Sequence, residues 1–295
     1  MVPSVLIAEV GVVTRSLWKW TRLASPKWED AWEERLRFLG ERLVIYQGNR
    51  ARMLRFEAYL DDERSAAALR ERFGGTVKEI PAAQRLAPQK RRDPLRIRGV
   101  LTVIDSDEPS PPRTPGSAIP LHVPAGMAFG TGEHATTATC LRILCDLAPK
   151  LPVGWRLLDL GTGSGILAIA GRALGAAKVE AFDNDPVCVR IAKENVKRNG
   201  ANRIVVRRGD VLRWEPVAPF EVVTSNLYSE VLIQAAPAIA AAVAPGGILI
   251  FSGVLRTQYA ECANAFRAEG LDVEAPRVRG KWTAGVARRV GSKFD

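Results

Sequence analysis

Short apolar runs alternate with helix-like segments over the C-terminal part of the chain. Runs typical of buried strands occur at residues 119–123, 156–160, 179–182, 203–209, 220–225 and 248–252. Apolar residues recur at helical spacing between them, over residues 138–147, 166–174, 187–198, 232–243 and 259–269. Residues 273–289 are predicted to hold two last strands. Because strands and helices alternate, we predict an α/β domain built on a mostly parallel sheet.

The first eighty residues follow a different pattern. Strands are predicted at residues 16–24, 42–47, 53–59 and 76–80, and helices at 28–39 and 64–73. This β-α-β-β-α-β order is typical of a small ferredoxin-like α+β domain. We therefore divide the chain into a ferredoxin-like domain at 1–82, a linker at 83–117 and an α/β domain at 118–295. The linker is rich in proline and arginine, with one strand predicted at 99–104.

Composition narrows the class of protein. The formal net charge is +10, which favours an acidic partner such as RNA, a ribosomal surface or an acidic protein. An arginine-rich proteome is the alternative explanation. The four cysteines form no C-x-x-C pair, so we expect reduced thiols, no metal site and a cytoplasmic location. The apolar run at 2–13 contains Glu9 and is too short to span a bilayer, so we expect no membrane association.

A glycine turn organises the predicted α/β domain. Gly161-Thr-Gly-Ser-Gly165 follows the strand at 156–160 and opens a helix, and Asp183 stands at the tip of the next strand. Glycines let a ligand approach the backbone closely, and an acid at the second strand tip can accept both hydroxyls of a ribose. The turn does not match G-x-G-x-x-G. With Asp159 two residues before it, the turn resembles motif I of the S-adenosylmethionine (SAM) methyltransferases. The alternative is a nucleotide-free domain with a glycine-rich turn.

Three more polar residues fall where ligands bind in such sheets, at the carboxyl ends of the strands or at a helix start. Asp210 is placed to meet an adenine amine, and Asn226 offers a donor and an acceptor near the transferred methyl group. Thr137 begins a predicted helix, where its hydroxyl and the free N–H groups suit a carboxylate. Each has a structural alternative: a turn cap for Asp210, a strand end for Asn226 and a helix cap for Thr137.

Four further residues keep two interpretations each. His134 is a general base or a backbone hydrogen-bonding residue, and Tyr228 lines a lysine channel or packs in the core. Glu230 attracts a cationic amine or stays in solvent, and Trp282 closes the site or belongs to the core.

Two longer motifs resemble those of a known family. Met127-Ala-Phe-Gly-Thr-Gly-Glu-His-Ala-Thr-Thr137 and Ser225-Asn-Leu-Tyr-Ser-Glu230 are similar to segments of the ribosomal protein L11 methyltransferases, the PrmA family. The resemblance extends from about residue 119 to the end; before residue 81 only the element order agrees. It implies a Rossmann-like class I methyltransferase domain behind a ferredoxin-like recognition domain.

The same resemblance implies an activity and a site. The activity is transfer of a methyl group from SAM to lysine side chains and the N-terminal amine of ribosomal protein L11. Matched positions assign SAM contacts to Thr137, Gly161, Asp183 and Asn226, and Phe129 to the wall of the methionine end. With Gly163, Asp210 and a catalytic role for Asn226, this completes the predicted site. We expect a monomer that works near ribosomal RNA.

The sequence also departs from the family. Residues 82–92 contain no tryptophan where the family has a tryptophan-rich segment, and the chain is basic where members are often acidic. A lysine methyltransferase acting on another protein, an RNA methyltransferase and an inactive SAM-binding module that docks on ribosomes therefore stay open. The sequence Asn226-Leu-Tyr lacks the Asn-Pro-Pro-Tyr form of enzymes that methylate planar nitrogens, which argues against the RNA enzyme.

Overall fold

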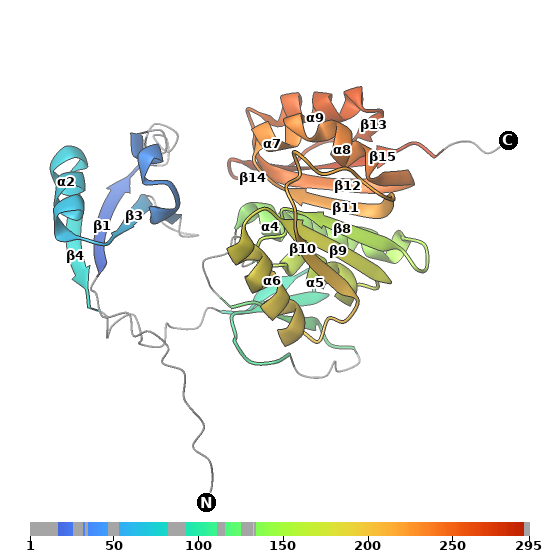
Figure 1. Ribbon diagram of the computed structural model, residues 1–295, viewed down its shortest axis with the longest axis horizontal. Helices are drawn as coiled ribbons and strands as arrows, with labels where there is room; N and C mark the ends of the chain where they lie inside the picture. Colours follow the sequence, from blue (N-terminus) through green and yellow to red (C-terminus); the bar gives the residue numbers. More distant parts are fainter. Residues whose placement is uncertain are drawn as a thin grey trace, which may run out of the picture. The chain divides into compact units, whose positions relative to one another are not determined.

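The chain forms two compact units, which are described separately. The computed structural model describes residues 17–25, 32, 35–46, 53–81, 93–110, 116–124, 132 and 134–291. One unit comprises Met1–Lys90 and the other Arg91–Asp295 (Figure 1). Residues 28–31, 33 and 34 of the helix predicted at 28–39 and the predicted site residue Phe129 lie outside the described residues.

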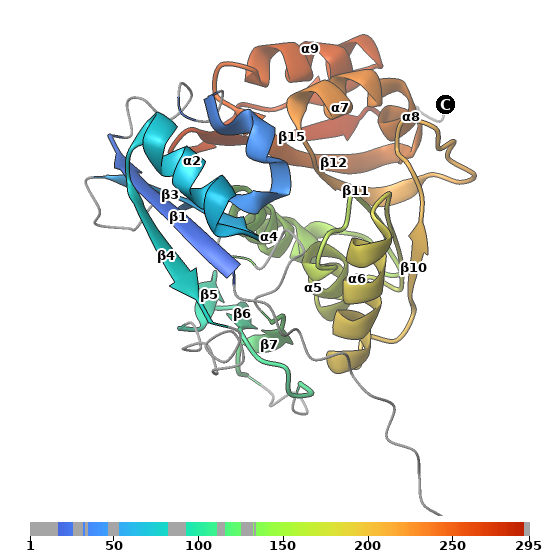
Figure 2. The ribbon, with the colours of Figure 1, turned by 60° about the vertical axis from the view of Figure 1, so that its left-hand side comes forward.

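The N-terminal unit is a four-stranded antiparallel sheet with the order β2-β3-β1-β4. Its elements are β1 (Leu17–Ala24), the 3-10 helix η2 (Arg37–Arg42), β2 (Leu43–Tyr46), β3 (Leu54–Leu60), α2 (Glu63–Phe73) and β4 (Thr76–Ile80). Helix α2 packs on one face of the sheet (Figure 2), and Trp20 and Phe56 are fully buried in the core. This strand order, with α2 between β3 and β4, is the one that a ferredoxin-like arrangement requires.

The C-terminal unit is built on an eight-stranded sheet with the order β10-β9-β8-β11-β12-β15-β13, and β14 pairs with β15. The strands are β8 (Arg156–Leu160), β9 (Lys178–Asp183), β10 (Ile204–Arg208), β11 (Phe220–Asn226), β12 (Val243–Leu255), β13 (Leu271–Val273), β14 (Arg277–Arg279) and β15 (Trp282–Arg289). The first five in this order run parallel, and β15 is antiparallel to its neighbours. The order reverses between β8 and β11, so a crevice is expected outside their carboxyl ends.

Helices cover both faces of this sheet, as Figure 1 shows. They are α4 (Ala135–Leu147), the 3-10 helix η3 (Ala148–Lys150), α5 (Ile166–Ala173), α6 (Pro186–Arg198), α7 (Ser229–Gln234), α8 (Ala236–Ala241) and α9 (Tyr259–Ala268). One buried apolar cluster joins α4, α5 and α6 to the sheet, and a second joins α7, α8 and α9 to the other face. The Rossmann-like α/β prediction is thus confirmed. Among the described residues no helix is long and apolar enough to cross a membrane.

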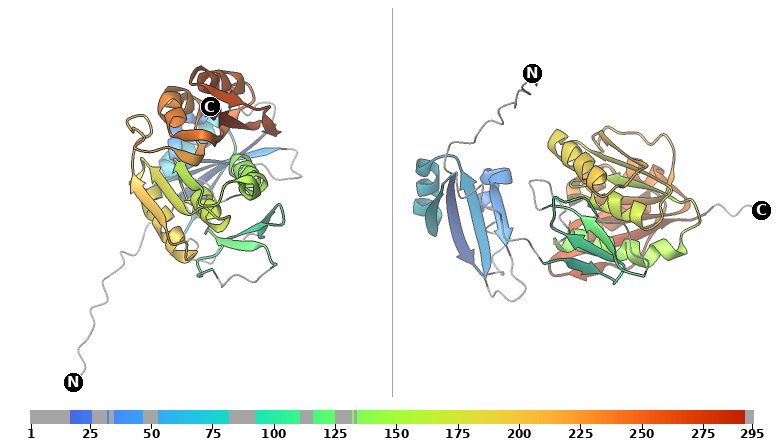
Figure 3. Two further views of the ribbon diagram at one scale, coloured as in Figure 1. Left: turned by 90° about the vertical axis from the view of Figure 1, so that its right-hand side faces the viewer. Right: turned by 90° about the horizontal axis from the view of Figure 1, so that it is seen from below.

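Part of the segment predicted as a linker is folded into this unit. Strands β5 (Leu95–Ile97) and β6 (Leu101–Ile104) form a hairpin, and β7 (Ile119–His122) pairs in parallel with β6. These three strands form a separate small sheet (Figure 3). Ile97, Leu101 and Leu121 are buried in the cluster that contains α4 and α5. Alternating burial along β6 is the physical reason why a proline-rich segment still carries ordered strands.

The long helix predicted at 232–243 is wrong in detail. The structure has two short helices, α7 and α8, that meet at Ala235, and β12 begins at Val243. Pro237 occupies the start of α8, where a missing N–H is tolerated but a continuous helix is not. The alanine-rich run hid this break because alanine favours helix in every frame.

Replacing Gly285 with alanine should destabilise the C-terminal unit. Gly285 lies opposite Phe251 in the β12–β15 ladder, and an added Cβ would lie 2.1 Å from Cζ of the Phe251 ring. The ring cannot move freely, since it is fully buried, stacked on Tyr259 and in tilted contact with Phe266. We expect Gly285→Ala to lower the free energy of unfolding by about 1–3 kcal/mol, measured by urea denaturation.

Gly291→Ala is the matched control, because the nearest atom to its added Cβ is 3.8 Å away. Equal urea midpoints for the two variants would show that the packing of Phe251 against β15 does not limit stability.

Candidate active site

The glycine turn adopts a backbone conformation that other residues rarely take. Gly161, Gly163 and Gly165 have φ values of 68°, 54° and 80°, and Gly165 precedes the first turn of α5. The amides of Gly161 and Thr162 both donate to the carbonyl of Phe182 on β9, at 3.0 and 3.1 Å. A Cβ on Gly161 would lie 2.3 Å from Cδ2 of Leu227. The turn is therefore held tightly between β9 and the segment that follows β11.

Asp159 holds the glycine turn in place through hydrogen bonds. Its side chain is buried, and its two oxygens accept hydrogen bonds from Oγ1 of Thr162, at 2.5 Å, and Oγ1 of Thr224, at 2.6 Å. Burial raises the pKa of Asp159 to about 6, although the two hydroxyl donors act in the opposite direction. Thr224 lies on β11, so this carboxylate joins the glycine turn to the strand that ends in Asn226.

Asp183 stands at the tip of β9, as predicted, and contacts the glycine turn. Its Oδ2 accepts from the amide of Gly163 at 2.9 Å, and its Oδ1 accepts from the amide of Asp185 at 3.1 Å. Only 9% of the residue is exposed. Each carboxylate oxygen can accept a further hydrogen bond, so the group fits a ribose diol while it holds the turn.

Asp210 follows β10, the neighbour of β9. Its Oδ1 accepts from the amide of Leu212 at 3.1 Å, and its carboxylate lies 3.8 Å from the guanidinium of Arg213. The amide of Gly209 donates to the carbonyl of Asp183 at 3.0 Å, which brings the two acids to adjacent strand tips. Asp210 therefore caps a turn and also lies at the same edge of the sheet as Asp183.

Thr137 and Asn226 meet although 89 residues separate them. Nδ2 of Asn226 donates to Oγ1 of Thr137 at 3.3 Å. Helix α4 begins at Ala135, earlier than predicted, because His134 acts as its N-cap and accepts from the amide of Thr136. Thr137 is thus in the first turn, where backbone N–H groups lack intrahelical partners. The residue that caps this helix is therefore His134, and the alternative role of Thr137 as a helix cap is wrong.

Two buried oxygens at the end of β11 have no hydrogen-bond partner among the residues that the structure describes. They are Oγ of Ser225 and Oδ1 of Asn226. Buried polar atoms are nearly always paired, so these two mark a place where a polar ligand group fits. The acceptor of Asn226, the carboxylate of Asp183 and the glycine turn together fit a nucleoside-containing cofactor.

Aromatic and basic residues border the start of α4. The His134 ring lies edge-on to Trp282, with centroids 4.9 Å apart, and its Nδ1 lies 2.6 Å from Oγ1 of Thr136. Burial, together with the nearby Lys281, lowers the pKa of His134 to about 4, so the ring is neutral at pH 7. Trp282 is only partly buried and Tyr228 is 74% exposed, so Tyr228 does not pack in the core.

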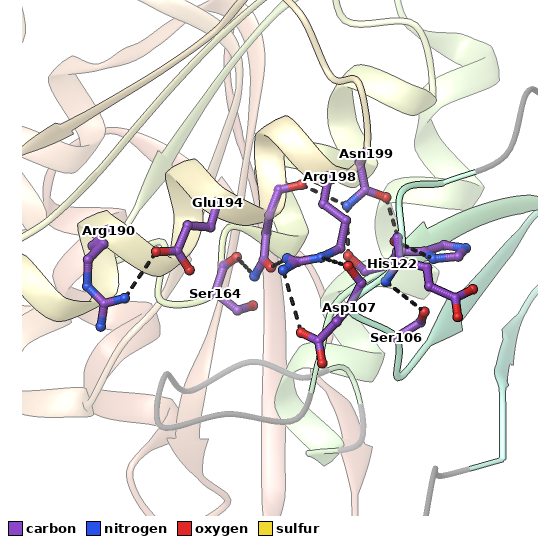
Figure 4. A network of polar contacts seen from close by, with 10 residues as sticks. Ser106, Asp107, His122, Ser164, Arg190, Glu194, Arg198 and Asn199 are labelled. Carbon is purple, nitrogen blue, oxygen red and sulfur yellow. Dashed lines mark hydrogen bonds and ion pairs between the residues drawn. The ribbon is translucent and has the colours of Figure 1, made fainter. Parts of the chain in front are cut away.

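Sequence reasoning missed Asn195, which supports the glycine turn from α6. Its Nδ2 donates to the carbonyl of Ser164 at 2.8 Å, and its Oδ1 accepts from Arg198. The network continues to Asn199, which exchanges two hydrogen bonds of 2.8 Å with the backbone of His122 on β7 (Figure 4). The available signal was a polar residue at helical spacing from the buried Val189 and Ala192.

These features define a class of protein. A sheet of this order, with a glycine turn after β8 and an acid at the tip of β9, forms a class I methyltransferase domain, whose cofactor is SAM. The profile of the family "Ribosomal protein L11 methyltransferase (PrmA)" matches residues 85–290. The chain belongs to this family.

Individual relatives agree with this assignment. A ribosomal protein L11 methyltransferase of Chloroflexus aurantiacus is 43% identical over 188 residues, which are 56% of this chain and 56% of that protein. One of Bordetella parapertussis is 40% identical over 218 residues, 71% of this chain and 68% of that protein. In the first case the match spans just over half of the relative's length.

A solved structure is also similar. The crystal structure of a ribosomal protein L11 methylase from Lactobacillus delbrueckii subsp. bulgaricus is 25% identical, with a TM-score of 0.58. The similarity covers 68% of this chain and all of that one.

We expect Gly161→Ala to lower the free energy of unfolding by about 1–3 kcal/mol and to weaken SAM binding about tenfold. The added Cβ would collide with Leu227, and φ of 68° is strained for alanine. Urea denaturation and calorimetric titration with SAM measure the two effects.

A double-mutant cycle with Leu227→Ala separates the collision from the backbone strain. In the Leu227→Ala background, Gly161→Ala should cost less stability than in the wild type, because only the strain remains. An equal cost in both backgrounds would contradict the contact between Leu227 and the turn.

The raised pKa of Asp159 predicts a pH-dependent stability. The pKa of Asp159 is about 6 in the folded protein and 3.8 in a free carboxyl group. The protonated carboxyl therefore contributes stability that is fully present below pH 3.8. This stabilisation is lost as pH rises through about 6, and it amounts to about 3 kcal/mol. Relative to wild type, Asp159→Asn should therefore be more stable at about pH 7 than at about pH 4. A stability difference that does not change with pH would contradict a buried, ionising Asp159.

Proposed function

We propose that the chain is a SAM-dependent protein methyltransferase that N-methylates lysine side-chain amines, and the N-terminal amine, of ribosomal protein L11. The observation that carries the proposal is the carboxamide of Asn226, which donates to Thr137 and keeps a buried acceptor without a partner among the described residues. The names of the relatives from Chloroflexus aurantiacus and Bordetella parapertussis support L11 as the substrate.

The residues around the glycine turn would hold SAM, which supplies an electrophilic methyl group on a sulfonium when it is bound. Asp183 would accept the ribose hydroxyls, and Asp210 would meet the adenine amine. The backbone of Gly161 and Gly163 would face the methionine portion. Thr137 and the free amides of its helix turn would hold the carboxylate. Phe129, which lies outside the described residues, is assigned to the wall of the methionine end.

Asn226 would act on the amine nucleophile. A lysine amine has a reference pKa of about 10.4, so it must lose a proton before it attacks. Oδ1 of Asn226 can accept a hydrogen bond from the neutral amine. This hydrogen bond would orient the lone pair of the amine nitrogen toward the methyl carbon. His134 is a weaker candidate for a base, because its Nδ1 is already engaged by Thr136.

The remaining assignments complete the proposal. Residues 1–82 recognise the substrate, and residues 83–117 connect the two domains. Within this connecting segment, β5 and β6 pack against the core of the C-terminal unit. The enzyme acts as a cytoplasmic monomer close to ribosomal RNA. Its basic charge is consistent with such surroundings.

Methyl transfer to a ribosomal fraction tests the proposal. The purified chain is incubated with tritiated-methyl SAM and unmethylated ribosomal proteins, and labelled residues are located by mass spectrometry. Label on lysines or the N-terminus of L11 is expected. Label on another protein or on RNA would overturn the substrate, and SAM binding without any label would favour the inactive docking module.

Asn226→Ala should reduce turnover about a hundredfold while it changes the Kd for SAM only slightly, because Asn226 orients the nucleophile. Steady-state kinetics and calorimetry provide the two numbers. Asn264→Ala is the control, since Asn264 is exposed and bonds only to Arg267 among the described residues. Equal losses of turnover and SAM affinity in Asn226→Ala would contradict the catalytic role.

A further inference from the structure

A basic pocket lies on the C-terminal unit outside the proposed SAM site. Its volume is about 380 Å³. Four arginines line it together with three other residues; the set is Arg98, Arg142, Arg277, Arg279, Thr139, Ile143 and Val278. We call this set the arginine pocket. None of the residues assigned to SAM that the structure describes lines it, so we treat it as a separate feature of the molecule.

Three elements form the arginine pocket. Thr139, Arg142 and Ile143 occupy one face of α4 at helical spacing, and β14 packs against this helix. Arg98 follows β5, which also contacts α4. The first turn of α4 carries Thr137, so a single helix connects the pocket with the proposed site.

Among the described residues, the arginine pocket carries more positive charge than the acidic side chains that pair with it can neutralise. Asp146, one turn beyond Arg142, accepts from Arg98 at 2.9 Å and from Arg277 at 3.2 Å through the same oxygen. Arg142 donates to the carbonyl of Ala138 at 3.0 Å, and neither Arg142 nor Arg279 has an acidic partner within the described ranges. Among the described residues, one carboxylate that pairs with two of the four guanidinium groups thus leaves a local excess of three positive charges.

The crowding is energetically unfavourable. Burial lowers the pKa of Arg142, and the nearby charges of Arg279 and Arg98 lower it further. An anion held between these guanidinium groups would remove that repulsion. Guanidinium groups bind phosphate through paired N–H donors, and a pocket of this volume can hold more than one phosphate-sized group.

We propose that the arginine pocket binds phosphate groups of an RNA strand. A phosphodiester strand supplies successive anions, which suits arginines that lie on three different elements. The carboxylate of Asp146 already pairs with Arg98 and Arg277. Arg142 and Arg279 have no acidic partner among the described residues, so they are available to bind phosphate. The choice of RNA as the phosphate source rests on the proposed function, in which the enzyme acts close to ribosomal RNA.

Fluorescence anisotropy of the full chain with a short labelled single-stranded RNA tests this proposal. The double variant Arg142→Gln/Arg279→Gln should bind about tenfold more weakly. It should also reduce the slope of log K against log salt by about 1.4, the value for two lost phosphate contacts on a single strand. Arg142→Lys/Arg279→Lys should restore the salt slope but only part of the affinity, since lysine lacks the paired donors.

Lys193→Gln/Lys197→Gln is the matched control. It removes two positive charges from exposed positions of α6, away from the arginine pocket. Equal weakening of RNA binding in the two glutamine variants would show a general charge effect and overturn the proposal. If the arginine double variant is unfolded by circular dichroism, Arg279→Gln alone serves, because Arg279 is exposed.

Competitors identify the source of the anion. Displacement of the RNA by dilute inorganic phosphate, or by an acidic peptide at lower concentration than unlabelled RNA, would overturn an RNA site. Methyl transfer to isolated L11 is measured in parallel and should be unchanged in the arginine variant. Pocket-dependent RNA binding in a wild-type chain that transfers no methyl group would refute the proposed function while the arginine pocket stands.

Discussion

The buried carboxylate of Asp159 is the interaction on which the rest of the C-terminal unit depends. Its hydrogen bonds to Thr162 and Thr224 join the glycine turn after β8 to β11, across the point where the strand order reverses. Asn226 ends the same strand two residues after Thr224, so its position follows from this link. Burial raises the pKa of this carboxyl group. The fold tolerates the buried carboxylate because both of its oxygens accept hydrogen bonds.

Around this link the molecule separates two kinds of chemistry. The carboxyl ends of the parallel strands gather acids, an amide and glycine backbone, which fit a nucleoside cofactor and an amine. The outer face of α4 and β14 gathers arginines, which fit phosphate. Helix α4 contributes to both, with Thr137 in its first turn and Arg142 further along, so ligands at the two places would meet the same rigid element.

The sequence predicted the parts whose physics is local. A glycine turn between a strand and a helix, and acids at strand tips, are determined by neighbouring residues, so Gly161 and Asp183 were found where the structure places them. Interactions that depend on distant segments were not predictable. The hydrogen bond of Asn195 to the glycine turn and strand β5 within the predicted linker both depend on tertiary packing. The break at Ala235 is a different case, because Pro237 signals it in the sequence and the surrounding alanines outweighed that signal in the prediction.

A crystal structure with S-adenosylhomocysteine tests the central claim most directly. The account predicts the ribose hydroxyls on the carboxylate of Asp183, the amino-acid end on the glycine turn and near Thr137, and the sulfur directed toward Asn226. A ligand bound away from the carboxyl ends of β8, β9 and β11, or one whose ribose does not contact Asp183, would contradict it.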